Sequence, residues 1–188
     1  MGIGAGLKAF NLQDWIQKNR HRLQPPVNNQ LLFEDAGMIV MAIGGPNQRT
    51  DFHDDPVEEY FYQLKGNMVL RVMDEPGSPP RDIPIREGEV MLLPAHVRHS
   101  PQRPEAGSIG IVVESPRHDP YVDAFEWYCL ECHRLVYRFE YPLRKSQEIV
   151  TVMPPLFEKF YSDETLRKCP HCGALHPGRN ALAATAAH

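Results

Sequence analysis

The 188-residue chain lacks the features that would assign it to a membrane, to secretion or to a nucleic-acid complex. It has no run of about eighteen apolar residues, so no membrane-spanning helix is expected. Its beginning, MGIGAGLKAFNLQDW, has no basic segment followed by a long apolar core, and Gly6 stands where a myristoylation signal requires Ser or Thr. The net charge of −4 and the pI of about 6.1 argue against a nucleic-acid groove. We therefore expect a cytoplasmic protein without a membrane or nucleic-acid partner.

Short segments separated by turn residues make up most of the chain, which contains 18 prolines and 13 glycines. An amphipathic helix is predicted over 7–23, with Asn11 as its N-cap. About eight short apolar segments follow at the spacing of strands in a sandwich or barrel. Two of them, 58–66 and 67–73, are predicted to pair with each other. A second helix, opened by proline, is predicted over 154–168. The predicted fold class is therefore mainly β.

The character of the sequence changes near Phe125, and all four cysteines lie beyond it. We predict a barrel with its N-terminal helix over 1–124. A C-terminal helix and a small metal-binding module, packed on the barrel, are predicted over 125–180. The alanine-rich end, 181–188, is predicted to be a disordered tail.

Two blocks of polar residues recur at a fixed spacing within the predicted strands. They contain, in order, His53, Asp55, Glu59 and Gly66, and then Gly88, Pro94, His96, His99 and Arg103. This spacing resembles the two motifs of the cupin superfamily, whose fold is a jelly-roll β-barrel. Four positions depart from the motifs: Asp55 stands where many cupins have a second His, His96 replaces a Gly, Arg103 replaces an Asn, and the first Gly is displaced, since Gly45 lies eight residues before His53.

Two imidazoles and one carboxylate, from His53, Glu59 and His99, can occupy one face of an octahedral metal ion and leave three positions open. This is the arrangement of non-haem Fe(II) oxygenases, in which a substrate and O2 bind side by side. A glutamate inside a barrel would be costly to bury without a metal or a basic partner. The alternative is that these residues are polar side chains in solvent-exposed turns.

The neighbours of these residues are weaker ligand candidates. Asp54, Asp55 and Glu58 are expected to be solvated or to support the ligands rather than bind the metal. Because side chains alternate along a strand, Glu58 and Glu59 point in opposite directions, and the cupin spacing favours Glu59 as the inward one. His96 is a further ligand candidate, and the alternative is a histidine in a loop.

Longer stretches of the sequence resemble one particular family. They are GGPNQRTDFHDDPVEEYFYQLKGNM, LLPAHVRHSPQRPEAGS, FEWYC, PPLFEKFY and CPHCGALHPGR. Together they resemble the 3-hydroxyanthranilate 3,4-dioxygenases, in their short bacterial and fungal form, over about residues 10–179. The resemblance implies Fe(II)-dependent ring cleavage of 3-hydroxyanthranilate, with O2 as co-substrate. The product would be 2-amino-3-carboxymuconate semialdehyde, the precursor of quinolinate.

The resemblance also implies roles for single residues. His53, Glu59 and His99 match the iron ligands of the family. Its catalytic and substrate-contacting residues are matched by Arg49, Arg103 and Glu114. Further positions that match its substrate pocket are Asn29, Pro101, Ile149 and Met153. A homodimer is implied as well, with the N-terminal helix and segment 30–35 as candidate interface.

The chemistry of three of these side chains agrees with those roles. The substrate carries a carboxylate beside an amine and a hydroxyl group, and a planar guanidinium from Arg49 or Arg103 is a natural partner for that carboxylate. Glu114 could accept a proton or hydrogen bond from the hydroxyl or the amine. The alternatives are surface salt bridges for the arginines and an ordinary strand-end carboxylate for Glu114.

The cysteines form two CxxC pairs, Cys129 with Cys132 and Cys169 with Cys172, with 36 residues between the pairs. Two such pairs supply four thiolates for a tetrahedral zinc or iron ion. Disulfides and free thiols are the alternatives, and a reducing compartment disfavours disulfides. The family resemblance implies a rubredoxin-like site holding a second Fe or Zn, away from the catalytic iron, and we interpret it as structural.

Two functions of different classes therefore compete. One is the ring-cleaving dioxygenase, and the alternative is a non-catalytic cupin that binds a metal or small molecule and carries a structural zinc ribbon. The two arginines beside the ligand candidates favour the enzyme, because a pure binding protein does not need open metal positions.

Overall fold

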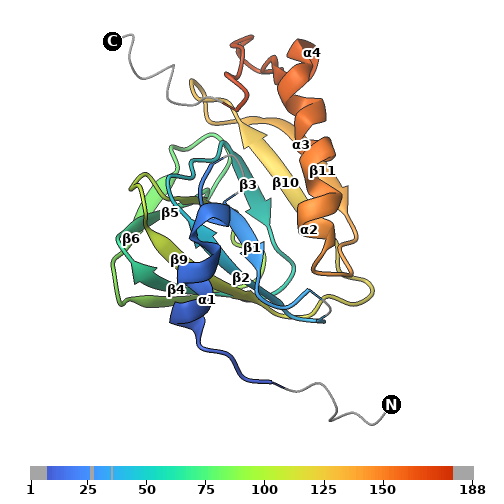
Figure 1. The fold of residues 1–188 in the computed structure, drawn as a ribbon. Helices are drawn as coiled ribbons and strands as arrows, with labels where there is room; N and C mark the ends of the chain where they lie inside the picture. The colour runs from blue at the N-terminus through green and yellow to red at the C-terminus, as the bar shows by residue number, and fades with distance from the viewer. Residues whose placement is uncertain (1–7, 26–27, 35, 180–188) are drawn as a thin grey trace.

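The structure is a computed structural model that describes residues 8–25, 28–34 and 36–179 (Figure 1). Its helical elements are α1 (Leu12–Asn19), the 3-10 turn η1 (Arg20–Arg22), α2 (Glu148–Thr151), α3 (Met153–Ser162) and α4 (Glu164–Arg167). The strands are β1 (Asn29–Leu31), β2 (Ile39–Gly44), β3 (Asp51–Asp54), β4 (Glu59–Lys65), β5 (Met68–Val72), β6 (Arg81–Ile85), β7 (Val90–Leu93), β8 (His99–Gln102), β9 (Ile109–Glu114), β10 (Asp123–Tyr128) and β11 (Leu135–Tyr141). In these ranges no helix has both the length and the apolar character needed to cross a bilayer.

Two antiparallel sheets form the body of the molecule. One has the order β1-β2-β9-β4-β7, and the other has the order β11-β10-β3-β8-β5-β6. Their buried side chains meet in one core, to which both sheets contribute residues such as Phe61, Val112, Leu70 and Val72. The predicted mainly β class is confirmed: the two sheets form a barrel with an N-terminal helix and a C-terminal four-cysteine module.

The predicted pairing of 58–66 with 67–73 is wrong. β4 pairs with β7 and β9 in the first sheet, whereas β5 pairs with β6 and β8 in the second. Gly66, in the left-handed region at φ 65°, lies between these two strands. The chain therefore crosses from one sheet to the other at this turn, which places the strand that begins with Glu59 opposite the strand that begins with His99.

The N-terminal helix begins where it was predicted to begin. The side chain of Asn11 accepts a hydrogen bond from the backbone N–H of Asp14 at 3.0 Å, so the predicted N-cap is confirmed. The helix proper is shorter than the predicted range and continues as η1. Its buried side chains, Ile16 and Leu23, pack on Ala42, Ile109 and Ile111 of the first sheet.

The C-terminal helix α3 lies against β10 and β11, which extend the second sheet beyond the barrel (Figure 1). Its Phe160 stacks on Trp127 of β10, with ring centroids 4.3 Å apart. The helix predicted over 154–168 is divided in two by Asp163, whose side chain caps α4 by accepting from the Thr165 N–H at 2.8 Å. The predicted domain boundary falls inside β10, which pairs with β3 on one side and β11 on the other. The predicted tail, 181–188, lies outside the described residues.

Candidate functional site

Three strands bring His53, Glu59 and His99 together. His53 on β3 and His99 on β8 are paired across the second sheet, and Glu59 opens β4 in the first. All three are buried, and one ligand atom from each lies within 4.8 Å of the others. Residues that are 46 positions apart in the chain therefore converge between the two sheets.

The donor set fits a metal ion. Glu59 Oε2 lies 2.7 Å from His99 Nε2, yet within the described part of the chain it has no hydrogen bond of normal geometry. Burial alone would raise the pKa of Glu59, but the two imidazoles hold that pKa below its ordinary value. A buried carboxylate oxygen aimed at a ring nitrogen without a proper hydrogen bond is the arrangement expected when both atoms are ligands of one metal ion.

His53 is fixed from two sides. Its ring stacks on Phe125 of β10, with centroids 4.5 Å apart and planes 2° from parallel. Asp123, on the same strand, accepts a hydrogen bond from His53 Nε2 at 2.9 Å. A carboxylate on one ring nitrogen orients a histidine and leaves the other nitrogen for a metal.

Arg117 lies at the centre of a buried cluster of carboxylates. Its Nη2 donates to Glu114 Oε2 at 2.7 Å and to Asp55 Oδ2 at 2.8 Å. Its Nε donates to both carboxylate oxygens of Asp123, at 2.8 and 2.9 Å. Through Asp123 this cluster reaches His53, so the predicted metal ligand and Glu114 belong to one hydrogen-bonded network.

Glu114 ends β9 and is paired in register with Glu59 of β4. Burial raises the pKa of Glu114 to about 7, against the opposing charge of Arg117. A carboxylate with a pKa near neutrality can take or release a proton under physiological conditions. The alternative of an ordinary strand-end glutamate does not fit a residue that is only 3% exposed.

Arg103 is a buried arginine whose charge has no anionic partner among the described residues. It is 1% exposed, and in the described chain its Nε and Nη2 make no hydrogen bond. A Cβ at Gly110 would lie 2.4 Å from Nη2, so only glycine leaves room for this side chain. Burial lowers the pKa of Arg103 to about 10, which still leaves it charged at neutral pH. A buried cation with free donors is costly unless an anion binds there.

Arg49 differs from Arg103 because it already has an anionic partner. Its guanidinium is paired with Asp51, two residues along the chain. Gln102 holds its backbone by donating to the Arg49 carbonyl at 3.0 Å. The pKa of Arg49 is affected first by burial, which lowers it, and then by Asp51, which raises it above its ordinary value. The charge of Glu59 also acts on this arginine.

The four predicted pocket residues lie on four different elements, β1, β8, α2 and α3. Pro101 is buried on β8 between His99 and Arg103. Asn29 accepts a hydrogen bond from Asn47 at 3.3 Å, and the backbone of Asn47 bridges that of Arg103. Met153 packs in one cluster with Phe125, the ring that stacks on His53, and Ile149 packs against the barrel core.

The weaker candidates have mixed outcomes. Glu58 is exposed and Glu59 is buried, as strand alternation predicts. Asp54 and Asp55 are both buried, which contradicts a solvated role; Asp55 bonds to Arg117 and Asp54 to His96.

His96 has a left-handed backbone, with φ 63°. Glycine adopts this conformation most readily, which explains why the related motifs carry glycine at this position. Its side chain points to Asp54, at 3.0 Å, and nothing in the described residues places it among the metal-ligand candidates.

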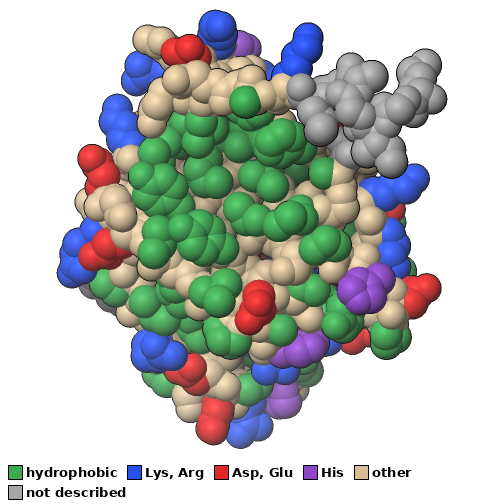
Figure 2. Space-filling view, turned by 90° about the horizontal axis from the view of Figure 1, so that it is seen from below, with side chains coloured by type: hydrophobic (Ala, Val, Ile, Leu, Met, Phe, Trp, Pro, Cys, Tyr) green, Lys and Arg blue, Asp and Glu red, His purple; other side chains and the backbone are tan. Residues whose placement is uncertain are grey.

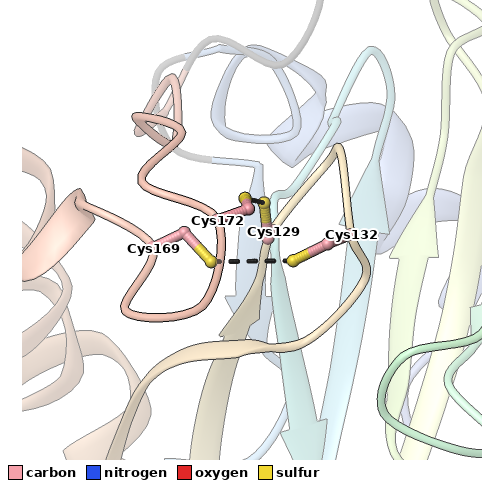
Figure 3. Close-up of side chains that lie close together, drawn as sticks. All are labelled: Cys129, Cys132, Cys169 and Cys172. Carbon is pink, nitrogen blue, oxygen red and sulfur yellow. Dashed lines mark hydrogen bonds between the residues drawn. The ribbon is translucent and has the colours of Figure 1, made fainter.

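The four cysteines converge as predicted (Figure 3). Cys129 Sγ lies 3.5 Å from Cys172 Sγ, and Cys132 Sγ lies 3.7 Å from Cys169 Sγ. Thiolates bound tetrahedrally at about 2.3 Å would be about 3.8 Å apart, so these spacings fit one metal ion. None of the four forms a disulfide.

The two cysteine turns have the same backbone design. The Cys129 N–H donates to the carbonyl of Arg134 at 2.9 Å, and the Cys169 N–H donates to that of Ala174 at 2.8 Å. The residue after the second cysteine is left-handed in both turns: His133 has φ 56° and Gly173 has φ 80°. Each turn therefore presents its two thiols with little help from the rest of the fold.

Sequence reasoning missed Arg117, Asp123 and Phe125. Arg117 lies in an irregular segment after β9, where no periodic pattern marks it. The available signal was in β10, where Asp123 opens a strand that is buried throughout. A charged residue in such a strand needs a buried partner.

The fold and the site together define the class of protein. It is a two-sheet barrel with a buried candidate metal site of two histidines and one carboxylate, and with a separate site of four thiols. The family model described as 3-hydroxyanthranilic acid dioxygenase matches residues 5–161. The chain belongs to this family.

Curated relatives agree with that assignment. The 3-hydroxyanthranilate 3,4-dioxygenase of Brucella anthropi is 57% identical over 174 residues, covering 93% of this chain and 94% of the relative. The enzyme of the same name from Ruegeria pomeroyi is 54% identical over 175 residues, covering 93% and 94%. Among solved structures, a cupin-2 domain protein of Shewanella frigidimarina is similar with a TM-score of 0.44 and 16% identity. It covers 58% of this chain and 95% of that one, and at this score the likeness carries no further argument.

Proposed function

We propose that the protein is an Fe(II)-dependent dioxygenase that cleaves the ring of 3-hydroxyanthranilate with O2 to 2-amino-3-carboxymuconate semialdehyde. The observation that carries the proposal is a buried guanidinium, Arg103, which has no anionic partner among the described residues but is affected by the charge of Glu59, a member of the two-histidine, one-carboxylate set, in a chain of this family. The metal-ligand candidates supply the place for the chemistry, and the arginine supplies the place for a carboxylate.

His53, Glu59 and His99 would hold the iron. When bound, Fe(II) supplies a centre at which an aromatic substrate and O2 can react side by side. Both oxygen atoms enter the product, so the overall reaction needs no external reductant. The protein keeps this centre between the two sheets, where His53, Glu59 and His99 are at most 7% exposed.

Arg103 would bind the substrate carboxylate through its free Nε and Nη2. A charge-assisted, bidentate contact fixes both the position and the plane of the ring. Arg49, which is already paired with Asp51, would add positive potential from the side rather than a second fork. Asn29, Pro101, Ile149 and Met153 would complete the walls of the pocket.

Glu114 would accept the proton of the substrate hydroxyl. Its raised pKa suits this exchange, because it can accept a proton near pH 7 and release it again. Arg117 holds the carboxylate by one oxygen, Oε2, so the other oxygen remains for the substrate.

The four-cysteine site would hold a second Fe or Zn as a structural staple. Burial opposes ionisation of Cys169, but N–H groups of Cys172 and His171 bring its pKa down to about 7. Burial raises the pKa of Cys129 to about 12, so the four thiols do not ionise alike, and the spacing of their sulfur atoms is what supports a bound metal. Metal analysis of the purified protein, with one equivalent expected per four cysteines, identifies the ion.

A homodimer is the proposed assembly. Hydrophobic side chains gather across one face of the molecule, which lies at the lower side of Figure 1 (Figure 2). On the outer side of the first sheet, Tyr60 pairs in register with Leu92, and both are exposed, as is Val90. Leu92→Lys should therefore shift the protein toward monomer in sedimentation, whereas Leu175→Lys, at an exposed site in the cysteine module, should not.

The direct test of the activity is O2 uptake. Purified protein loaded with Fe(II) is given 3-hydroxyanthranilate, and the near-ultraviolet absorbance of the semialdehyde is followed alongside oxygen consumption. We expect one O2 consumed per ring cleaved, and no reaction after the iron is chelated. An iron-loaded protein that binds the substrate but consumes no O2 would overturn the proposal and favour the non-catalytic binding protein.

A further inference from the structure

A second set of potential metal ligands overlaps the proposed iron site. His53, Asp55 and Asp123 also bring one ligand atom each within 4.8 Å of one another, and all three are buried. The two sets share His53, so a metal ion has two candidate positions around the same imidazole. Spacing and burial alone do not separate the sets, because a histidine with two carboxylates is also a plausible site for a divalent cation.

One side chain separates the two sets. Arg117 donates a hydrogen bond from Nη2 to Asp55 and from Nε to both oxygens of Asp123. Its guanidinium therefore binds both carboxylates of the second set but not Glu59, the carboxylate of the first. Its side chain is only 2% exposed, which keeps these bonds out of competition with water. His99 and Glu59 make no hydrogen bond to it in the described structure.

The cluster is poor in positive charge. One guanidinium faces three carboxylates, those of Asp55, Glu114 and Asp123, and the described contacts include no second cation in it. Removing Arg117 would leave these carboxylates buried and close together, with only the bonds from His53 to Asp123 and from the Val57 N–H to Asp55 remaining to the two aspartates. Such a group either takes up protons or binds a cation.

We propose that Arg117 directs the metal: by occupying Asp55 and Asp123, it reserves His53 for the set with Glu59 and His99. This inference rests on the proposed iron site and adds a residue that decides where the iron binds. Arg117 is thus a positioning residue, because it acts through Asp55 and Asp123 and touches neither Glu59 nor His99.

A second arginine in the molecule provides a matched control. Arg138 also bonds to three carboxylates, those of Asp54, Glu126 and Glu140. It has no contact with His53 in the described structure, and its carboxylates are not among the candidate metal-ligand groups found there. A substitution of Arg138 therefore tests the loss of an arginine from a carboxylate cluster without changing the ligands around His53.

The test counts metal ions and does not depend on turnover. Fe(II), and Co(II) as a spectroscopic substitute, are titrated anaerobically into four proteins whose cysteine site is already filled: wild type, Glu59→Ala, Glu59→Ala with Arg117→Met, and Glu59→Ala with Arg138→Met. Glu59→Ala should lose the equivalent bound near His53. Adding Arg117→Met should restore it, on the order of 10- to 100-fold tighter than Glu59→Ala alone, with a changed Co(II) spectrum. Adding Arg138→Met should restore nothing.

Two results would overturn the proposal. One is a Glu59→Ala, Arg117→Met protein that binds metal no better than Glu59→Ala; the other is equal restoration by Arg138→Met. If Arg117→Met does not fold, Arg117→Gln replaces it, because a neutral amide removes the positive charge that holds Asp55 and Asp123, and the absence of any gain in affinity is again decisive. Failure of the proposed activity would instead appear as a wild type that binds iron at this site without consuming O2.

Discussion

The two candidate metal sites are built in opposite ways. Each cysteine turn is local: it carries two ligands three residues apart and closes on its own backbone hydrogen bonds. The barrel site takes its three ligands from three strands in two sheets and depends on Phe125, Asp123 and Arg117 to hold one of them. A site with four local ligands is complete, whereas a site with three distant ones keeps room for substrates.

The largest effect is expected at the barrel site. His53→Ala, Glu59→Ala and His99→Ala should each reduce turnover to the background of the iron-containing buffer, because two remaining ligands hold the iron too weakly. The protein should stay folded, since the core between the sheets is unchanged. Activity and iron content are measured on each variant, with Glu58→Ala, an exposed neighbour, as control. A Glu59→Ala protein with full iron and near-normal activity would show that the ligand assignment is wrong.

Substitutions at the cysteine site should lower the stability of the protein without changing its catalytic rate. Cys129→Ser or Cys169→Ser should remove one metal equivalent and lower the free energy of unfolding by more than about 4 kcal/mol, because loss of a bound metal is among the few single changes with effects of that size. Molecules that remain folded should keep the kcat of the wild type. Loss of turnover in a folded variant that retains its catalytic iron would argue against a purely structural site.

Substrate binding at the barrel site should also depend on Arg103, the buried arginine that has no anionic partner in the described chain. Arg103→Ala should raise KM for 3-hydroxyanthranilate about 10- to 150-fold, which corresponds to roughly 1.5–3 kcal/mol for a buried bidentate contact. Part of the loss should appear in kcat, because a loosely held ring departs from its reactive position. Steady-state kinetics are compared with those of Arg86→Ala, an exposed arginine on the barrel surface.

The carboxylate itself provides the decisive comparison for Arg103. The analogue 2-aminophenol lacks it and should be a poor substrate for the wild type, but nearly insensitive to Arg103→Ala. Equal losses for both compounds would mean that Arg103 acts on something other than the carboxylate.

The smallest effect concerns acid stability beside the cysteine site. Burial lowers the pKa of His176 to about 4, below the value of about 6.5 expected in the unfolded chain. The unfolded state therefore binds more protons between these values, so the stabilisation is complete above pH 6.5 and decreases as the pH falls toward 4. Between pH 6.5 and 5 the decrease should be about 2 kcal/mol. Urea unfolding of His176→Gln should lack this part of the slope, whereas His171→Gln, at an exposed position, should keep it.

The sequence correctly predicted the features that depend on interactions between residues close together in the chain. The cap at Asn11 and the cysteine cluster each depend on a few adjacent residues, and both are confirmed. The alternation of Glu58 and Glu59 follows from the pleat of one strand.

Long-range contacts explain what the sequence could not show. β4 and β5 look like neighbours because they are separated only by a turn, but the turn leads into the opposite sheet. Arg117 bonds to Asp55 over 62 positions, and no spacing rule connects them. Family resemblance located the metal-ligand candidates through their spacing, but it did not reveal the cluster that supports them, because that cluster exists only after folding.

The late position of β10 in the sequence affects when the site can form while the chain is being synthesised on the ribosome. β3, which carries His53, shares one paired position with β8 and four with β10. Asp123, the first residue of β10, is 69 positions beyond Asp54, the last of β3. At a synthesis rate of roughly 5–20 residues per second, β3 waits about 3 to 14 seconds for its main partner, with one edge open. The nascent protein therefore cannot assemble the surroundings of His53 until about two-thirds of the chain has been made, and iron loading is expected to follow the synthesis of β10 rather than precede it.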